Sequence, residues 1–499
     1  MGNERYEYSS GKVYLIGAGP SDIGLFTLRG KEVLERAEVV LYDALVSAEI
    51  LMLVNDNAKL INVGKRSSNH LMKQEDINKI LLEEAQNGNT VVRLKGGDPF
   101  LFGRGGEELE LLAENNIDFE IIPGVTSAIA VPAYNGIPVT HRDICSSLHI
   151  ITGHKRAGKD YDINFKALVD IRGTLVFLMG VSALEDICFG LIEGGMSKDM
   201  PIAILQKGTT AKQKRIVATV GTAAEKVQEE GIETPAIIVV GEVCKLSQDF
   251  SWYEKLELSG KKVLVPRPKE LSSKLAERLR SKGAQVVEMS TIKCVKNENK
   301  EVANTFAQLE MFDWIVLTSP TGVNVFFENL RRANKDLRTL ASVKFAVVGT
   351  GTEKSLFEKG IIADLVPEVF DGDSLAEAMI KRGVKGDQIL IARAKKGRKE
   401  IVERLNSAGA EVRDLTTYDM DFCDNMYISD KIKDVEYIMF TSSSTVEAFV
   451  LGNPDFDLHN IKALCIGERT EAKAKSFGMK TFVSKQATLD SLVELLSEC

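Results

Sequence analysis

The sequence predicts an α/β protein with an N-terminal α/β part and a C-terminal pair of similar α/β lobes. Three observations support this prediction. Residues 12–242 alternate short apolar strand candidates with helix candidates, a pattern typical of α/β domains with a mainly parallel sheet. The second half alternates in the same way, and it also repeats itself after about 120 residues, which is too long for a solenoid repeat.

Length and composition place the chain among ordinary globular proteins. Its 499 residues predict two to four domains, and 44% hydrophobic with 27% charged residues excludes disordered and fibrous classes. No apolar run approaches the ~18 residues of a membrane span, and the polar N-terminus lacks a signal-peptide core. We therefore expect a cytoplasmic protein.

Charge and cysteine usage exclude further classes. The net charge of −8 and the lack of a basic stripe with aromatics argue against nucleic-acid binding. Seven scattered cysteines, none in C-x-x-C spacing, indicate reduced thiols and no metal site.

The strand candidates of the first half mostly end in glycine. Ligands gather at the carboxyl ends of strands in open α/β sheets, and glycine permits a close backbone approach there, so we expect several of these loops to line one cleft. The candidates are residues 12–17, 38–43, 90–97, 119–124, 147–153, 173–180, 201–208 and 236–243.

The second half contains three echoes in the same order. The stretch from Val263 recurs from Ile389, "LTSPTGV" around Thr318 recurs as "FTSSSTV" around Thr441, and a third stretch recurs around Gly467. We interpret this as two similar lobes that enclose a cleft. The predicted domains are residues 1–244, a polar linker at 245–259, and residues 260–499.

The first loop, "GAGPSD", has the outline of a dinucleotide fingerprint. Asp43 lies where a Rossmann site places its ribose-binding acid. However, Pro20 removes a backbone donor and Asp22 adds a negative charge where a pyrophosphate would bind. A nicotinamide site, another glycine-rich binding loop and a structural turn all stay open from these residues alone.

The loop "RLKGGDPFLFGRGGEE" is denser in glycine. Its glycines allow a flat ligand to approach the main chain, and Asp98 can accept from a ribose hydroxyl or an amine, or else cap a helix. Thr126 and Ser127 offer hydroxyls for capping or for binding. The cations Lys65, Arg66 and Arg142 follow apparent strands, although a solvated surface is the usual place for such residues.

Residues 12–242 closely resemble the uroporphyrinogen-III C-methyltransferases of the tetrapyrrole methylase superfamily. The matching motifs are "GAGPSD", "YDALVS", "GKR", "RLKGGDPFLFGRGGEE", "PGVTSA", "AYNGIPVTHR", "ITGH" and "LMG". The resemblance implies a two-subdomain α/β fold and use of the first loop for S-adenosylmethionine and substrate. Ser21 departs from the family pattern, which usually has glycine there.

The resemblance also implies roles for individual residues. Asp43 is the expected proton acceptor and Lys65 the expected proton donor. The expected contacts to S-adenosylmethionine are Pro20, Gly96, Gly97, Asp98, Leu101, Thr126, Ser127, Met179 and Gly208. Candidates for binding the substrate's carboxylates are Arg66, Arg104 and Arg142, because arginine is well suited to carboxylates.

Residues 260–499 resemble uroporphyrinogen-III synthase. This resemblance gives Tyr418 a role in departure of the substrate's hydroxyl, while ordinary helix capping is the alternative role for the Ser and Thr runs. The expected carboxylate-binding hydroxyls are Thr318, Ser319, Thr441, Ser442, Ser443 and Thr470.

Together the two resemblances imply a bifunctional enzyme. It would cyclise hydroxymethylbilane to uroporphyrinogen III and methylate that product twice to precorrin-2, for cobalamin or sirohaem. The alternative is a methyltransferase of another corrinoid intermediate joined to a non-catalytic tetrapyrrole-binding module. Because such methyltransferases often dimerise, a homodimer through residues 1–244 is a further expectation.

Overall fold

The computed structural model describes residues 11–55, 57–64, 72–153, 163–268, 274–395, 400–423 and 425–499. These residues form two compact units. The larger comprises residues 11–267, 274–290 and 425–499, and the smaller comprises residues 291–423. Within the described ranges, no helix combines the length and apolarity needed to cross a membrane.

The first sheet of the larger unit is parallel throughout, in the order β3-β2-β4-β1-β5. Its strands are β1 (Val13–Gly17), β2 (Val39–Tyr42), β3 (Lys59–Asn62), β4 (Val91–Lys95) and β5 (Phe119–Ile122). The accompanying helices are η1 (Ile23–Leu25), α1 (Leu28–Leu34), α2 (Ala48–Leu51), α3 (Gln74–Gln86) and α4 (Gly105–Glu114).

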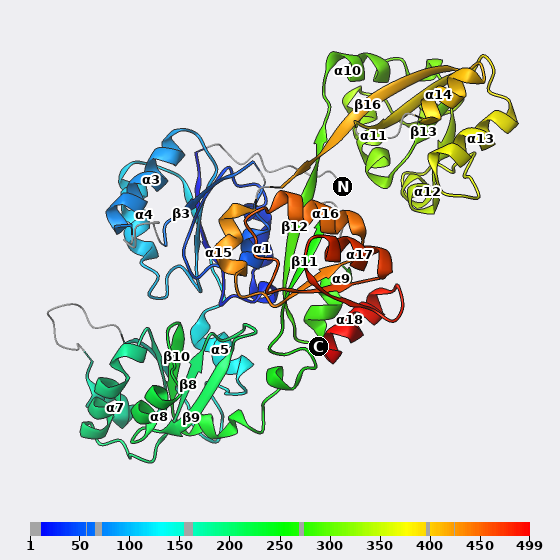
Figure 1. Cartoon of the computed structure of the whole chain (residues 1–499). Helices are drawn as coiled ribbons and strands as arrows, with labels where there is room; N and C mark the ends of the chain where they lie inside the picture. Colours follow the sequence, from blue (N-terminus) through cyan, green and yellow to red (C-terminus); the bar gives the residue numbers. More distant parts are fainter. Residues whose placement is uncertain are drawn as a thin grey trace. The chain divides into compact units, whose positions relative to one another are not determined.

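Both faces of this sheet are covered. On β1, Val13 and Leu15 belong to the core under α3 and α4, whereas Tyr14 and Ile16 belong to the core that includes residues of α1. This division follows from the two-residue period of a strand. Figure 1 shows α3 and α4 together beside β3. With both faces buried, the loops at the strand ends are left to form a site.

A second sheet follows in the order β6-β7-β10-β8-β9. Its strands are β6 (Leu148–Thr152), β7 (Thr174–Leu178), β8 (Pro201–Gln206), β9 (Lys214–Thr219) and β10 (Ala236–Val240). Its helices are α5 (Ser127–Tyr134), α6 (Phe165–Ile171), η2 (Val181–Ala183), α7 (Leu184–Glu193), α8 (Ala223–Glu229), η3 (Glu242–Ser247) and η4 (Tyr253–Lys255).

The predicted α/β class is confirmed, but the mainly parallel arrangement predicted for residues 12–242 holds for the first of their two sheets and not for the second. In the second, β10 pairs antiparallel with β7 and with β8, and β8 pairs antiparallel with β9. The short connection between β8 and β9 permits a hairpin, which parallel neighbours cannot form. An apolar run alone does not reveal the direction of a strand.

Among the described residues, the strands that lie wholly in the smaller unit have the order β14-β13-β15-β16. They are β13 (Trp314–Leu317), β14 (Lys344–Val347), β15 (Gln388–Ala394) and β16 (Glu411–Phe422). The surrounding helices are α10 (Lys300–Phe306), η5 (Leu309–Met311), α11 (Pro320–Arg332), η6 (Leu337–Leu340), α12 (Thr350–Phe357), α13 (Gly372–Arg382) and α14 (Glu400–Ser407).

The remaining strands are β11 (Lys262–Pro268), β17 (Tyr437–Phe440), β18 (Lys462–Cys465) and β19 (Lys480–Val483) in the larger unit, and β12 (Gln285–Lys296), whose chain continues from the larger unit into the smaller. The larger unit also holds α9 (Lys274–Ser281), η7 (Met426–Ile428), α15 (Ser429–Ile432), α16 (Ser443–Gly452), α17 (Glu468–Ser476) and α18 (Leu489–Glu498).

The two lobes do not coincide with the two sequence repeats. The β11-α9 stretch of the first repeat shares the larger unit with β17 and β18 of the second. The β15-α14-β16 stretch of the second repeat shares the smaller unit with β13 and β14 of the first. Each repeat therefore contributes to both lobes, which the spacing of the echoes does not reveal.

Candidate functional site

Three loops meet at the carboxyl ends of β1, β4 and β5. A Cβ placed on Gly17 would lie 2.4 Å from Cα of Gly124, and one on Gly124 would lie 2.2 Å from the carbonyl oxygen of Gly97. Gly19 and Gly97 also exchange two backbone hydrogen bonds, of 3.1 and 2.9 Å. Only glycine permits such close approach of main chains, so these motif glycines hold the loops together.

Asp98 organises two of these loops. Its Oδ1 accepts from the backbone N–H groups of Phe100 (2.9 Å) and Leu101 (3.2 Å), and its Oδ2 accepts from that of Gly124 (3.1 Å). The carboxylate therefore satisfies backbone donors of its own loop and of the loop after β5. Its contact with S-adenosylmethionine stays a prediction.

The first loop is held by groups that follow in the chain after β5. The Tyr134 hydroxyl donates to Asp22 Oδ2 over 2.8 Å, and the Thr209 hydroxyl donates to the carbonyl oxygen of Pro20. Burial, followed by the charge of Asp22, raises the pKa of Tyr134 well above its usual range, so its hydroxyl remains a donor. Ser21, between Pro20 and Asp22, has a φ of 102°.

Left-handed backbone conformations recur in the loops after β1, β4, β7 and β8. Non-glycine residues with positive φ cost energy and concentrate at functional sites. In these loops they are Ser21, Phe102, Arg104, Met179, Lys207 and Thr209. The concentration supports a functional role for the loops that the sequence motifs identify.

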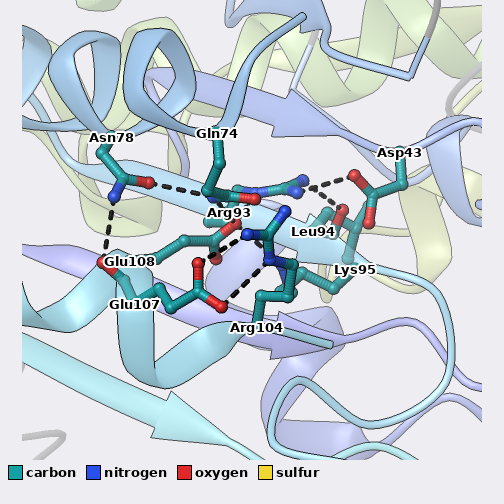
Figure 2. Close-up of polar contacts among 9 residues, drawn as sticks. All are labelled: Asp43, Gln74, Asn78, Arg93, Leu94, Lys95, Arg104, Glu107 and Glu108. Carbon is teal, nitrogen blue, oxygen red and sulfur yellow. Dashed lines mark hydrogen bonds and ion pairs between the residues drawn. The ribbon is translucent and has the colours of Figure 1, made fainter. Parts of the chain in front are cut away.

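Asp43 directly follows β2 and is part of a network of charged groups (Figure 2). Its Oδ1 accepts from Arg93 Nη2 over 2.6 Å, and Arg93 Nε donates to Glu108 Oε1 over 3.0 Å. Lys95 Nζ donates to the same Glu108 oxygen over 2.8 Å. The Glu108 side chain is fully buried, while that of Asp43 is 31% exposed, so Asp43 is the member that a ligand can reach.

Burial controls the electrostatics of this network. Burial, and then the neighbouring Arg93 cation, lowers the pKa of Lys95, while Glu108 and Asp43 oppose that effect. Arg93 keeps its charge because its guanidinium is not deprotonated in proteins. The two cations of β4 thus depend on the Glu108 carboxylate for charge compensation.

Two of the four predicted cations belong to the described residues. Lys65 and Arg66 lie outside the described residues. Arg104 is exposed and makes two bonds to Glu107, of 3.0 and 2.8 Å. Arg142 is exposed on the segment after α5. A substrate carboxylate would therefore have to compete with Glu107 for Arg104.

The other predicted S-adenosylmethionine contacts come from several elements. Thr126 caps α5 by accepting from the Ala128 N–H over 3.2 Å, and Ser127 is the first residue of that helix. Met179 follows β7 with half of its surface exposed. Gly208 follows β8, where a Cβ would lie 2.3 Å from a Val131 methyl carbon. The capping role that we weighed for Thr126 is thus observed.

In the smaller unit, two predicted residues of the synthase half meet. The Tyr418 and Ser319 hydroxyls are hydrogen-bonded at 2.7 Å, and Ser319 also caps α11 by accepting from the Gly322 N–H at 2.9 Å. Tyr418 is buried, and burial raises its pKa. Thr318 precedes Ser319 and is half-buried. This geometry brings a phenol and a hydroxyl together at the start of α11.

The remaining predicted hydroxyls lie in the larger unit. Ser442 caps α16 by accepting from the Thr445 N–H at 3.2 Å, and Ser443 donates to the carbonyl oxygen of Arg469 over 3.0 Å. Thr441 is exposed, whereas Thr470 is buried in α17. Helix capping, the alternative that we kept open, thus accounts for one hydroxyl in each run.

The sequence reasoning missed the roles of Arg93 and Lys95. A usable signal was present, because two cations two residues apart in an otherwise apolar strand point to the same face and require a buried counter-ion. It also missed Tyr134, whose bond to Asp22 joins residues 112 apart in the chain. No local pattern reports that contact.

Both halves match known protein families. Residues 12–224 match the tetrapyrrole (corrin/porphyrin) methylases, and residues 273–494 match uroporphyrinogen-III synthase HemD. The porphyrin biosynthesis protein HemD of Ruminiclostridium josui is 47% identical over 495 residues, covering 98% of each chain.

A uroporphyrinogen-III C-methyltransferase of Bacillus subtilis is 39% identical over 359 residues, or 72% of this chain and 73% of that one. The crystal structure of uroporphyrin-III C-methyltransferase from Thermus thermophilus with S-adenosyl homocysteine is 37% identical, with a TM-score of 0.40, and its match covers 47% of this chain and 99% of that one.

The match to the Ruminiclostridium josui protein extends across both halves, so it covers the two family regions together. The resemblances drawn from the sequence motifs are thereby confirmed. The chain belongs to the family of porphyrin biosynthesis proteins that join a tetrapyrrole methylase domain to a uroporphyrinogen-III synthase domain.

Proposed function

We propose that the C-terminal half closes hydroxymethylbilane to uroporphyrinogen III and that the N-terminal half methylates this product twice to give precorrin-2. The observation that carries the proposal is the presence of both family domains on one chain. The two reactions are consecutive, since the product of the synthase is the substrate of the methylase. We further propose cobalamin or sirohaem as the end product.

S-adenosylmethionine would supply an electrophilic methyl group on its sulfonium. The loop after β4 fits such a ligand, because Gly97 has a φ of +69° and a Cβ placed on it would meet no atom within 4 Å. A ligand can thus approach the main chain there. The residues proposed to hold it are Pro20, Gly96, Gly97, Asp98, Leu101, Thr126, Ser127, Met179 and Gly208.

Asp43 is the proposed proton acceptor. A pyrrole carbon becomes more nucleophilic as its N–H proton is removed, so a carboxylate beside the ring assists methyl transfer. Asp43 is partly exposed and its Oδ1 is held by Arg93, which supports this role. Lys65 is the proposed proton donor, and Arg66, Arg104 and Arg142 are the proposed partners of the substrate's carboxylates.

In the synthase half, the substrate supplies most of the reactivity. Loss of its hydroxyl as water leaves an electrophilic azafulvene, and the protein must favour the closure that inverts the last ring. Tyr418 is proposed to donate a proton to the departing hydroxyl, and its bond to Ser319 orients the phenol. Carboxylates of the substrate are proposed to bind Thr318, Ser319, Thr441, Ser442, Ser443 and Thr470.

The test supplies freshly generated hydroxymethylbilane with and without S-adenosylmethionine, and assigns products by mass and isomer. We expect the type III isomer without the methyl donor and a dimethylated product with it. Type I alone would remove the synthase activity and leave a binding module. Type III uroporphyrinogen that stays unmethylated would show that it is not the substrate of the methylase half.

Two variants assign the activities to their halves. Asp43→Asn should stop methylation while type III uroporphyrinogen still forms, and Tyr418→Phe should slow cyclisation while added uroporphyrinogen III is still methylated. Loss of both activities in either variant would contradict the assignment to separate halves.

We also propose the domain limits 1–244, 245–259 and 260–499, and a homodimer through the first of these.

A further inference from the structure

A fully buried carboxylate lies behind the proposed proton acceptor. Glu108, on α4, accepts at one oxygen from Arg93 Nε (3.0 Å), Lys95 Nζ (2.8 Å) and Gln74 Nε2 (3.0 Å). Its side chain has no exposed surface, so the tetrapyrrole cannot reach it. The chemistry proposed above makes no use of this group.

We propose that Glu108 is a positioning residue of the methyl-transfer site, which holds the Arg93 guanidinium against Asp43 and thereby sets the proton affinity of the Asp43 carboxylate. This inference rests on the proposed role of Asp43 as proton acceptor. It adds a residue that acts on the reaction through another.

The geometry supports the positioning part. Arg93 bridges the two carboxylates, with Nε on Glu108 and Nη2 on Asp43 at 2.6 Å (Figure 2). A guanidinium is planar and rigid, so fixing Nε also fixes the direction in which Nη2 points. The Arg93 side chain is 3% exposed, and its Nη1 donates to the carbonyl oxygen of Leu94 over 3.3 Å. The contact with Asp43 is therefore set by buried partners.

The charges of the network support the second part of the proposal, the effect on the proton affinity of Asp43. A cation beside a carboxylate favours its ionised form and weakens it as a base. Glu108 offsets that effect by placing a negative charge between the two cations of β4. Without it, Asp43 would face buried positive charge with no second carboxylate.

Two other cations of the described residues have partners outside this network. Lys431, on α15, donates to the carbonyl oxygen of Ala44 over 2.8 Å, and Arg104 is paired with Glu107. Lys65 and Arg66 lie outside the described residues. None of these cations is altered in the experiment below, so the effect of each on Asp43 is the same in the variants that are compared.

The experiment compares Lys95→Met with Lys95→Met/Glu108→Gln in the full-length protein. The lysine is removed first because a buried lysine can lose its proton and so hide a change of charge, whereas Arg93 cannot. The measurement is the pH profile of kcat for methylation of uroporphyrinogen III. We expect the acid limb to move about one pH unit lower in the double variant, with a lower kcat on the plateau. Acid limbs at the same pH in both variants would overturn the proposal.

A second variant tests the geometry if the double variant fails to fold. Glu108→Asp keeps the buried charge but withdraws it by one carbon from Arg93. We expect kcat to fall at least about tenfold with KM for S-adenosylmethionine within about twofold. An unchanged kcat in the folded protein would leave Glu108 with a structural role only.

The controls separate this proposal from the proposed function. Glu110→Gln, an exposed position on the same helix, should leave the pH profile unchanged. Full methylation by Asp43→Asn would remove the proton-acceptor role itself. Loss of methylation in Asp43→Asn, together with an unmoved acid limb in the paired Lys95 variants, would remove only the role of Glu108.

Discussion

Ser21 adopts a backbone conformation that disfavours side chains. Its φ of 102° lies in the region that glycine enters freely. Ser21→Gly should raise the free energy of unfolding by about 1 kcal/mol, because the strain of a non-glycine residue there exceeds the entropic cost of glycine. Thermal unfolding of the two proteins checks this.

Ser21→Ala is the matched control. It keeps the Cβ that strains the backbone, so it should not gain the stability of the glycine variant. If alanine stabilises as much as glycine does, the serine hydroxyl rather than the backbone conformation would be responsible.

Tyr418 offers a pH-dependent prediction. Burial raises its pKa, so the phenol stays a proton donor throughout the range below about pH 10. Tyr418→Phe should therefore slow cyclisation by a similar factor, about tenfold or more, at pH 7 and at pH 9. Synthase rates at both pH values check this. A defect that disappears at pH 9 would mean that the phenol already loses its proton there.

The raised pKa of Tyr418 also predicts how the stability of the protein depends on pH. A group whose folded pKa is raised contributes fully below its unfolded pKa, and this contribution is lost as pH rises through the folded value. The wild type should thus lose more stability than Tyr418→Phe between about pH 9 and pH 11.

At the scale of residues, the sequence predicted the residue types of the candidate site better than the hydrogen bonds between those residues. The motif points to Asp98 as a binding or capping residue, yet its bonds to three backbone N–H groups depend on how two loops approach each other. The bridge from Arg93 to Asp43 and Glu108 also joins separate elements. Motifs identify residue types, whereas these contacts arise only when distant strands and helices pack.

At the scale of elements, the close approach of glycines in the loops after β1, β4 and β5 predicts that a larger side chain there lowers the stability of the protein. Gly124→Ala would place a Cβ 2.2 Å from the carbonyl oxygen of Gly97, against main chain that cannot move aside easily. We expect a loss of at least about 2 kcal/mol in unfolding free energy, together with weaker binding of S-adenosyl homocysteine. Denaturant unfolding and calorimetry measure the two effects.

Gly106→Ala is the control for that prediction. It lies on α4, and a Cβ there meets no atom within 4 Å. Alanine is the better helix former, so this variant should be equally stable or up to about 1 kcal/mol more stable. Equal losses in the two variants would show that the close approach of the loops is not what makes Gly124 necessary.

The sequence located most strands of the methylase half, because a buried strand that ends in glycine is a strong local signal. The strand candidates do not include β3, which is only partly buried, or β9, whose pattern alternates between exposed and buried residues. The sequence also missed the antiparallel direction of β10. Direction depends on which neighbour a strand pairs with, and that is decided by packing across the sheet.

For the whole molecule, the sequence revealed the duplication of the synthase half but not its arrangement. The cores of the smaller unit contain residues from Val302 to Leu415 only. By contrast, Val263 and Leu275 of the first repeat share a core with Tyr437 and Leu492, beyond the start of the second. A repeat is therefore not a folding unit, although a lobe can be one.

This arrangement predicts how fragments of the chain behave. A fragment of residues 291–423 should unfold in one cooperative transition, because it holds both cores of the smaller unit and is large enough to bury them. A fragment of residues 262–386, one whole repeat, should lack such a transition, because part of the core around Val263, including Tyr437 and Leu492, lies beyond its end. Circular dichroism on heating distinguishes them. A cooperative repeat together with an unfolded lobe would contradict this division, because stability would then follow the duplication rather than the shared cores.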